Sequence, residues 1–330
     1  MKKYIKIFKI PMILVFIIFL SCSKPQEIKI ISKSEDNIRY FYLDDKVIAK
    51  WTYDKNFNSA KEGQIINGYV KMFWKDGAGE DYYEIIKYEN NKVIDEKYNS
   101  YYLTGQKKSV FEIKNGMING KIKEFYKDGK IKTEYFMTNN LKNGSYIEYF
   151  ENGVTHRKEN YKNGLLDGVL MAYSEKGKLD NTGTLIDDKE EGVFVWYYEN
   201  GKLRQEMEYK NGVENGLLKQ YYENGKLMDQ ATNINGKLNG KFLRYDDKGQ
   251  LIFEGLFKDG VKNGYSKEYM EDGTLKITGN YKNDKKNGLF ITYYSDGKKM
   301  LDEVYKNGEL VSSTDYDING KPMKKKVIKP

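Results

Sequence analysis

The stretch YKNGVENGLLKQYYENGKL, residues 209–227, contains the pattern that decides the fold. Its three glycines, Gly212, Gly216 and Gly225, each belong to a series whose members stand 24 residues apart along the chain. A fixed interval of this length is typical of repeat architectures, in which each unit is one supersecondary element. The repeat therefore has to be interpreted before any isolated motif.

The series that contains Gly212 shows what these positions do. Its members are Gly116, Asn140, Gly164, Asp188, Gly212, Gly236, Gly260, Asp284 and Gly308. Wherever glycine is replaced, the substitute is Asn or Asp, the two residues that best tolerate the left-handed backbone region. The series therefore predicts turns with positive φ and does not indicate ligand contacts.

The runs between the turns, such as 217–222 and 227–233, have the length of β-strands. We expect Asn224-Gly225 to form a tight turn, because Asn-Gly is the strongest short hairpin signal, and the NGxxNG segment 211–216 to form a longer loop. Isolated hairpins are marginal, so stacked neighbours must supply the stability. The sequence predicts an all-β fold, an elongated array of about ten antiparallel β-hairpin repeats that form a twisted meander.

An aromatic residue stands four places before each glycine of the Gly225 series. In seven consecutive units it is a tyrosine, and this tyrosine series comprises Tyr149, Tyr173, Tyr197, Tyr221, Tyr245, Tyr269 and Tyr293. The first interpretation is that these rings stack on neighbouring units along the array. The alternative is that they form a candidate binding stripe, because tyrosine offers a large contact area at low entropic cost.

Residues 1–21 have the layout of a secretory signal, with a basic start and an apolar run over residues 10–20. About eleven apolar residues are too few to span a bilayer as a stable helix. The segment FLSC, ending at Cys22, resembles the lipobox of bacterial lipoproteins, although Phe19 departs from its usual Leu or Val. The resemblance implies cleavage before Cys22 and lipid attachment to that cysteine. The alternatives are an uncleaved membrane anchor or a plain signal peptide.

A lipidated Cys22 would tether the chain to the cell membrane or the outer membrane, facing the periplasm or the exterior. We divide the chain into a cleaved signal peptide at 1–21, a strand-rich N-terminal cap or linker at 22–60, the repeat array at 61–311 and a basic C-terminal tail at 312–330.

The recurring pattern YxNGxxxGxxxxYYxNGKL, as in 209–227, resembles the MORN-repeat variant of bacterial proteins called YwqK-type antitoxin components. The resemblance covers about residues 61–311 and implies the hairpin-repeat fold. It is weak for function, because such repeats serve as scaffolds in unrelated contexts. An antitoxin-like role in a toxin–antitoxin pair is one alternative, but an exported protein would not meet a cytoplasmic toxin.

Composition excludes several classes of function. Of the 56 Lys and Arg residues, four lie within residues 1–21, so 52 basic residues face 48 acidic ones in the mature chain. These charges are interspersed, which is typical of a solvated surface and does not indicate a nucleic-acid partner. The single cysteine excludes an internal disulfide framework and a cysteine-rich metal site.

The residues for catalysis are also missing. His156 is the one histidine and lies beside a turn, and Cys22 is committed to lipid, so no Ser-His-Asp or Cys-His set can form. Paired acids could in principle serve a glycosidase, but most lie at or near turns: Asp44-Asp45, Asp187-Asp188, Glu190-Glu191 and Asp246-Asp247. We therefore expect no catalytic site, no cofactor and no metal. The predicted function is a non-catalytic scaffold that binds another envelope protein, and the alternative is a module that binds glycan or cell wall.

Overall fold

The computed structural model describes residues 31–33, 38–43, 46–53, 59–63, 67–75, 79–89, 92–93, 97–114 and 117–328. The predicted signal segment and Cys22 lie outside these residues, so cleavage and lipidation stay predictions. Two compact units are distinguished: Met1–Thr155 with Tyr161–Gly164, and His156–Asn160 with Leu165–Pro330. Among the described residues, no helix is long and apolar enough to cross a membrane.

A small sheet comes first. Its strands pair in chain order and are β1 (Ile31–Lys33), β2 (Ile38–Leu43), β3 (Lys46–Tyr53) and β4 (Ser59–Gly63). The further strands of the first unit are β5 (Asn67–Lys75), β6 (Asp81–Glu89), β7 (Lys92–Val93), β8 (Lys97–Tyr102), β9 (Lys107–Lys114), β10 (Met117–Ile118), β11 (Gly120–Phe125), β12 (Ile131–Thr138) and β13 (Leu141–Tyr149). The residues of β14 (Thr155–Lys162) are divided between the two units.

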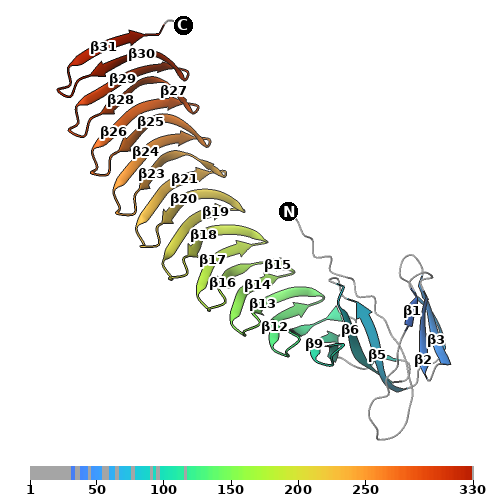
Figure 1. The fold of residues 1–330 in the computed structure, drawn as a ribbon. Helices are drawn as coiled ribbons and strands as arrows, with labels where there is room; N and C mark the ends of the chain where they lie inside the picture. Colours follow the sequence, from blue (N-terminus) through green and yellow to red (C-terminus); the bar gives the residue numbers. More distant parts are fainter. Residues whose placement is uncertain are drawn as a thin grey trace. The chain divides into compact units, whose positions relative to one another are not determined.

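The second unit continues the same construction. Its strands are β15 (Leu165–Leu166), β16 (Gly168–Tyr173), β17 (Leu179–Ile186), β18 (Lys189–Tyr197), β19 (Leu203–Lys210), β20 (Val213–Tyr221), β21 (Leu227–Ile234), β22 (Lys237–Leu238), β23 (Gly240–Tyr245), β24 (Leu251–Lys258), β25 (Val261–Tyr269), β26 (Leu275–Lys282), β27 (Lys285–Lys286), β28 (Gly288–Tyr293), β29 (Lys299–Lys306), β30 (Glu309–Tyr316) and β31 (Pro322–Val327). Within this unit, hairpin follows hairpin and sequence neighbours lie side by side (Figure 1). The fold is all-β, an open antiparallel meander of many hairpins, as the repeat predicts.

The turn positions of the Gly212 series have the positive φ that the Gly/Asn/Asp substitutions predict. Asn140 has φ 65°, Asp188 has φ 64° and Asp284 has φ 63°. The prediction of turn length, however, is wrong. Lys210 pairs with Val213, so the turn after β19 contains two residues only.

The tight turn lies at Asn211-Gly212 and the longer loop around Asn224-Gly225, the opposite of the prediction, and the backbone conformation explains why. Asn211 and Gly212 have φ values of 52° and 79°, and positive φ at both positions is what a two-residue type I′ hairpin requires. At the other turn, Gly225 alone has positive φ, while the Asn224 side chain accepts a hydrogen bond from the Lys226 backbone N–H at 2.9 Å. That Asx arrangement builds a loop of five residues between β20 and β21.

The second glycine of the NGxxNG segment lies inside a strand. Gly216 has φ 139° and belongs to β20 at a shift of register opposite Glu208. A Cβ at Gly216 would lie 2.6 Å from the Cβ of Glu208, so a side chain does not fit without movement. Glycine is therefore required here by a β-bulge and not by a loop.

One face of the sheet, called the packed face below, holds large rings above small residues. The ring of Phe194 covers Gly183, and the ring of Phe290 covers Gly279, leaving no room for a side chain at either glycine. Tyr209 packs edge-on against Phe194 with ring centroids 5.3 Å apart. In the described part of the second unit no second layer packs on the sheet, so cross-strand pairs of this kind provide the burial.

The segment expected to be a C-terminal tail differs from the prediction. β31 (Pro322–Val327) pairs with β30 from Ser312↔Val327 to Tyr316↔Pro322, so the meander continues beyond residue 311. All six side chains of β31 are exposed, and three of them are lysines. The segment has few apolar residues, so its sequence did not predict a strand. The strand is stabilised by backbone pairing to β30 and not by burial of side chains.

Candidate binding sites

All seven members of the tyrosine series are half-buried, at or near the ends of strands. Three hydroxyls donate to a carboxylate 15 residues earlier: Tyr149 to Glu134 at 3.1 Å, Tyr221 to Glu206 at 2.8 Å and Tyr269 to Glu254 at 3.2 Å. Burial, followed by the bond to Glu206, raises the pKa of Tyr221 to about 12. These three hydroxyls therefore hold neighbouring strands together.

A second tyrosine position joins successive 24-residue repeats. The sequence analysis did not predict it. The hydroxyl of Tyr198 donates to the carbonyl oxygen of Tyr221 at 2.6 Å, and that of Tyr222 donates to the carbonyl oxygen of Tyr245 at 2.8 Å. Tyr294 and Tyr316 form the same pair at 2.9 Å. The three donors, Tyr198, Tyr222 and Tyr294, are called clasp tyrosines below. The available signal was the aromatic doublet, as in Tyr197-Tyr198.

The predicted acid pairs mainly hold turns. Asp188 accepts a hydrogen bond from the Leu166 backbone N–H at 2.7 Å, and Glu191 accepts one from that of Asn211 at 2.9 Å. Asp246 accepts from the backbone N–H groups of Lys248 and Gln250, whereas the pair at 44–45 lies outside the described residues. In the part of the chain that the structure describes, no group of His, Cys, Asp and Glu residues is arranged to hold a metal ion.

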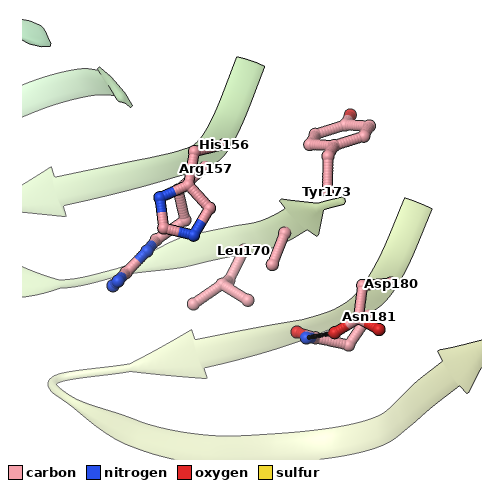
Figure 2. Close-up of a pocket in the computed structure, with 7 residues that line it drawn as sticks. His156, Arg157, Leu170, Tyr173, Asp180 and Asn181 are labelled. Atoms are coloured by element: carbon pink, nitrogen blue, oxygen red, sulfur yellow. Dashed lines mark hydrogen bonds between the residues drawn. The ribbon is translucent and has the colours of Figure 1, made fainter. Parts of the chain in front are cut away.

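His156 lies at a hollow of about 340 Å³ in the second unit (Figure 2). The lining residues are His156, Arg157, Leu170, Ala172, Tyr173, Asp180 and Asn181. Ala172 pairs with Arg157 of β14 on one side and with Asn181 of β17 on the other. These three residues and Leu170, two places from Ala172, therefore share the packed face.

The hollow exists because Ala172 is small. At intervals of 24 residues the same position is occupied by Glu124, Glu148, Ala172, Trp196, Gln220, Arg244, Glu268 and Thr292. Every other member has a larger side chain, so the sheet is covered there by atoms that Ala172 lacks. The depression follows from a local break in the repeat and not from the repeat itself.

Two further positions in this unit also depart from the pattern. Ser174 occupies the place of a clasp tyrosine, and Lys158 occupies the place of the carboxylates that bind the tyrosine series. Accordingly, the Lys158 ammonium lies over the Tyr173 ring, 5.7 Å from its centroid, and the Tyr173 hydroxyl contacts the Met171 sulfur at 3.3 Å. This repeat therefore has neither the tyrosine–carboxylate bond nor the clasp bond that Tyr221 and Tyr222 form.

Charges around the hollow are matched locally. Arg157 forms an ion pair with Glu159 at 2.9 Å, and the Glu159 side chain is 2% exposed. The Asn181 amide donates to the Asp180 carboxylate at 2.9 Å. The lining thus combines hydrogen-bond donors and acceptors with an apolar floor of Leu170 and Ala172, and it carries no strong excess of either charge.

The opposite face of the sheet has an exposed apolar strip on strands β16, β17, β18, β20 and β21. It consists of Val169, Ile186, Val193, Val213 and Ile234, which are 43–51% exposed. Strand register and alternation place all five on one face. Ile186 pairs with Lys189, four places from Val193, and Val169 pairs with Thr184, two places from Ile186. Val213 pairs with Lys210, two places from the partner of Val193, and Ile234 lies two places from Thr232, the partner of Leu217 in the strand of Val213. The five exposed apolar residues are called the valine–isoleucine strip below.

A family model described as the MORN repeat variant matches residues 118–139, 142–163, 190–211, 214–232, 238–259, 262–283 and 286–307. The chain is a MORN-repeat-variant protein. The matches keep the 24-residue spacing but pass over the unit between 163 and 190, which contains Ala172.

Three solved structures match the chain with low sequence identity and low structural similarity. A Photorhabdus luminescens Tc holotoxin pore matches with 13% identity and a TM-score of 0.17, over 84% of this chain and 18% of that one. TcdB2-TccC3 without its hypervariable C-terminal region matches at 11% and 0.19, over 86% and 17%. A Lactobacillus plantarum protein matches at 11% and 0.15, over 89% and 97%. No curated protein sequence matches the chain.

Proposed function

We propose that this protein is a membrane-anchored extracytoplasmic lipoprotein whose repeat array binds another envelope protein without catalysing a reaction. The observation that carries the proposal is the valine–isoleucine strip. Exposed apolar side chains that gather on one face of a sheet are unfavourable in water and are characteristic of interaction sites. A sheet held by cross-strand pairs on its other face can present such a strip without a second layer.

The roles of the tyrosines and acids also support a scaffold. The hydroxyl of Tyr221 and the carboxylates of Asp188 and Glu191 are engaged in holding neighbouring strands and turns. Groups committed in this way stabilise the array and are poorly placed to act on a substrate. Glycan binding along a regular tyrosine stripe is therefore the less favoured alternative, and no observation favours an antitoxin-like role.

Binding is tested by placing charge in the strip. Full-length protein with Val169→Lys and Val193→Lys is compared with wild type by cross-linking in the native envelope, followed by titration of each purified cross-linked protein. We expect the double variant to bind the partner at least about tenfold more weakly, the loss of roughly 1.4 kcal/mol that such a change represents. Equal binding by wild type and variant would contradict the proposal.

The matched control is Val304→Lys, because Val304 is also exposed but lies in β29, outside the strip. It should bind the partner as wild type does. Anchoring is tested separately by intact mass, since the wild type should carry acyl chains that Cys22→Ser lacks. A wild-type mass without acyl chains would overturn the anchoring part alone.

A further inference from the structure

The hollow around Ala172 is the one place in the second unit where three features coincide. The family model matches residues 142–163 and 190–211 but not the 24-residue repeat between them. That repeat supplies five of the seven lining residues. The repeated position is reduced to alanine there, and the neighbouring clasp position is Ser174. Each repeat is stabilised by contacts with its neighbours, so a repeat that has open space where the others have a larger side chain is a candidate site.

The floor and the rim of the hollow have different chemistry. Leu170 and Ala172 line the hollow and provide an apolar floor. Figure 2 shows the Tyr173 side chain on the other side of its strand from Leu170. The rim carries Arg157, Asn181 and Asp180, which combine guanidinium and amide donors with amide and carboxylate acceptors. A volume of about 340 Å³ lies at the small end of the range for small-molecule sites, ~300–1,000 Å³.

Charge narrows the class of ligand. The Arg157 guanidinium is paired with the buried Glu159 carboxylate, and Asp180 adds a further negative group, so an anion gains little here. The Arg157 guanidinium, whose side chain is 43% exposed, disfavours a cation at the same rim. The lining suits a neutral molecule that has an apolar face and several hydroxyl groups able both to donate and to accept hydrogen bonds.

We propose that this hollow binds one neutral sugar residue. The C–H face of the ring lies on Leu170 and Ala172, and its hydroxyls bond to Asp180, Asn181 and Arg157. This site is independent of the valine–isoleucine strip on the opposite face, so it goes beyond the proposed protein scaffold and would stand if no protein partner bound. It is a single non-repeated site and not the regular aromatic stripe considered above.

The test uses full-length protein in a detergent that contains no sugar. Glucose, N-acetylglucosamine and the β-1,4-linked disaccharide of N-acetylglucosamine are titrated separately, with glucuronate and glucosamine as charged counterparts. Binding is followed by saturation-transfer NMR and by the fluorescence of Trp196, which pairs directly with Asn181. We expect saturable binding of at least one neutral sugar with a Kd of about 1–10 mM, as a small, open site allows.

Ala172→Gln is the decisive variant. Glutamine occupies the equivalent position at Gln220, so the change fills the hollow with a residue that the same backbone already accommodates. It should weaken sugar binding at least tenfold without lowering the melting temperature. Glu268→Gln places the same residue at the same repeat position outside the hollow, and it should bind as wild type does.

A second variant keeps the proposal testable if Ala172→Gln disturbs folding. Asp180→Ala removes an exposed acceptor from the rim and should weaken binding at least fivefold with an unchanged melting temperature. Comparing the affinity for the disaccharide with the affinity for N-acetylglucosamine distinguishes a site for the end of a glycan chain from a site for a free monosaccharide. Absence of saturable binding by every neutral sugar, binding of the charged sugars only, or wild-type affinity in both variants would overturn the proposal.

Discussion

The Tyr198 hydroxyl donates a 2.6 Å hydrogen bond to the backbone carbonyl oxygen of Tyr221, 23 residues further along the chain. The bond joins one repeat unit to the next through a side chain, in addition to the strand pairing. An array without a second layer depends on such contacts, because each unit buries surface mainly against its neighbours.

Tyr198→Phe should lower the free energy of unfolding by about 1 kcal/mol, since it leaves the carbonyl of Tyr221 without this donor. The measurement is denaturant unfolding followed by circular dichroism. Tyr197→Phe is the matched control, because the hydroxyl of Tyr197 takes part in no comparable clasp. Equal losses in the two variants would contradict the role assigned to Tyr198.

Gly216→Ala should be clearly more destabilising than Gly201→Ala. Both glycines have positive φ, which costs a non-glycine residue roughly 1 kcal/mol. Only at Gly216 would the new Cβ also meet the Cβ of Glu208, whereas nothing lies within 4 Å at Gly201. Thermal unfolding of the two variants provides the comparison, and identical melting temperatures would refute the steric argument.

Glu254 should contribute acid-sensitive stability. Its burial favours the neutral form, but hydrogen bonds from Lys241 and Lys267 outweigh burial and lower its pKa to about 2. Because the folded-state pKa is below the usual value of 4.5, this contribution is present above pH 4.5 and is lost as the pH falls toward 2. Unfolding free energies between pH 5 and about pH 2.5 should fall less steeply in Glu254→Gln.

Glu84 should give the opposite pH dependence. Burial in β6 raises the pKa of this carboxyl from 4.5 to about 7. The stabilisation of the neutral form is therefore complete below pH 4.5 and is lost as the pH rises through 7. Hydrogen exchange of the β6 amides at pH 5 and pH 8 should show weaker protection at the higher pH in wild type. Glu84→Gln should abolish that difference, and its persistence would assign it to another group.

Local backbone chemistry explains why much of the fold was predictable. The substitution of Gly by Asn at position 140 and by Asp at position 188 predicted positive φ, and the structure has positive φ at both Asn140 and Asp188. These preferences act within a few residues, so they are visible in sequence. The relative length of the two turns was not predictable in the same way, because Asn224 uses its side chain to cap a loop instead of adopting positive φ.

Contacts between units could be predicted only in part. The tyrosine series was visible as a period, but the carboxylate that Tyr221 would meet was not, since Glu206 comes from another strand. The C-terminal strand β31 gave no signal, because its side chains are all exposed and backbone pairing alone positions it.

The sequence by itself determined the repeat, the hairpins and the left-handed turn positions, because each of these depends on short stretches of chain and on a period of 24 residues. Only the tertiary structure decided that Ala172 lies between Arg157 and Asn181 and leaves a hollow there. The physical reason is that a depression is defined by side chains from three strands at once. Their juxtaposition is set by strand register, in which the bulges displace one strand against the next.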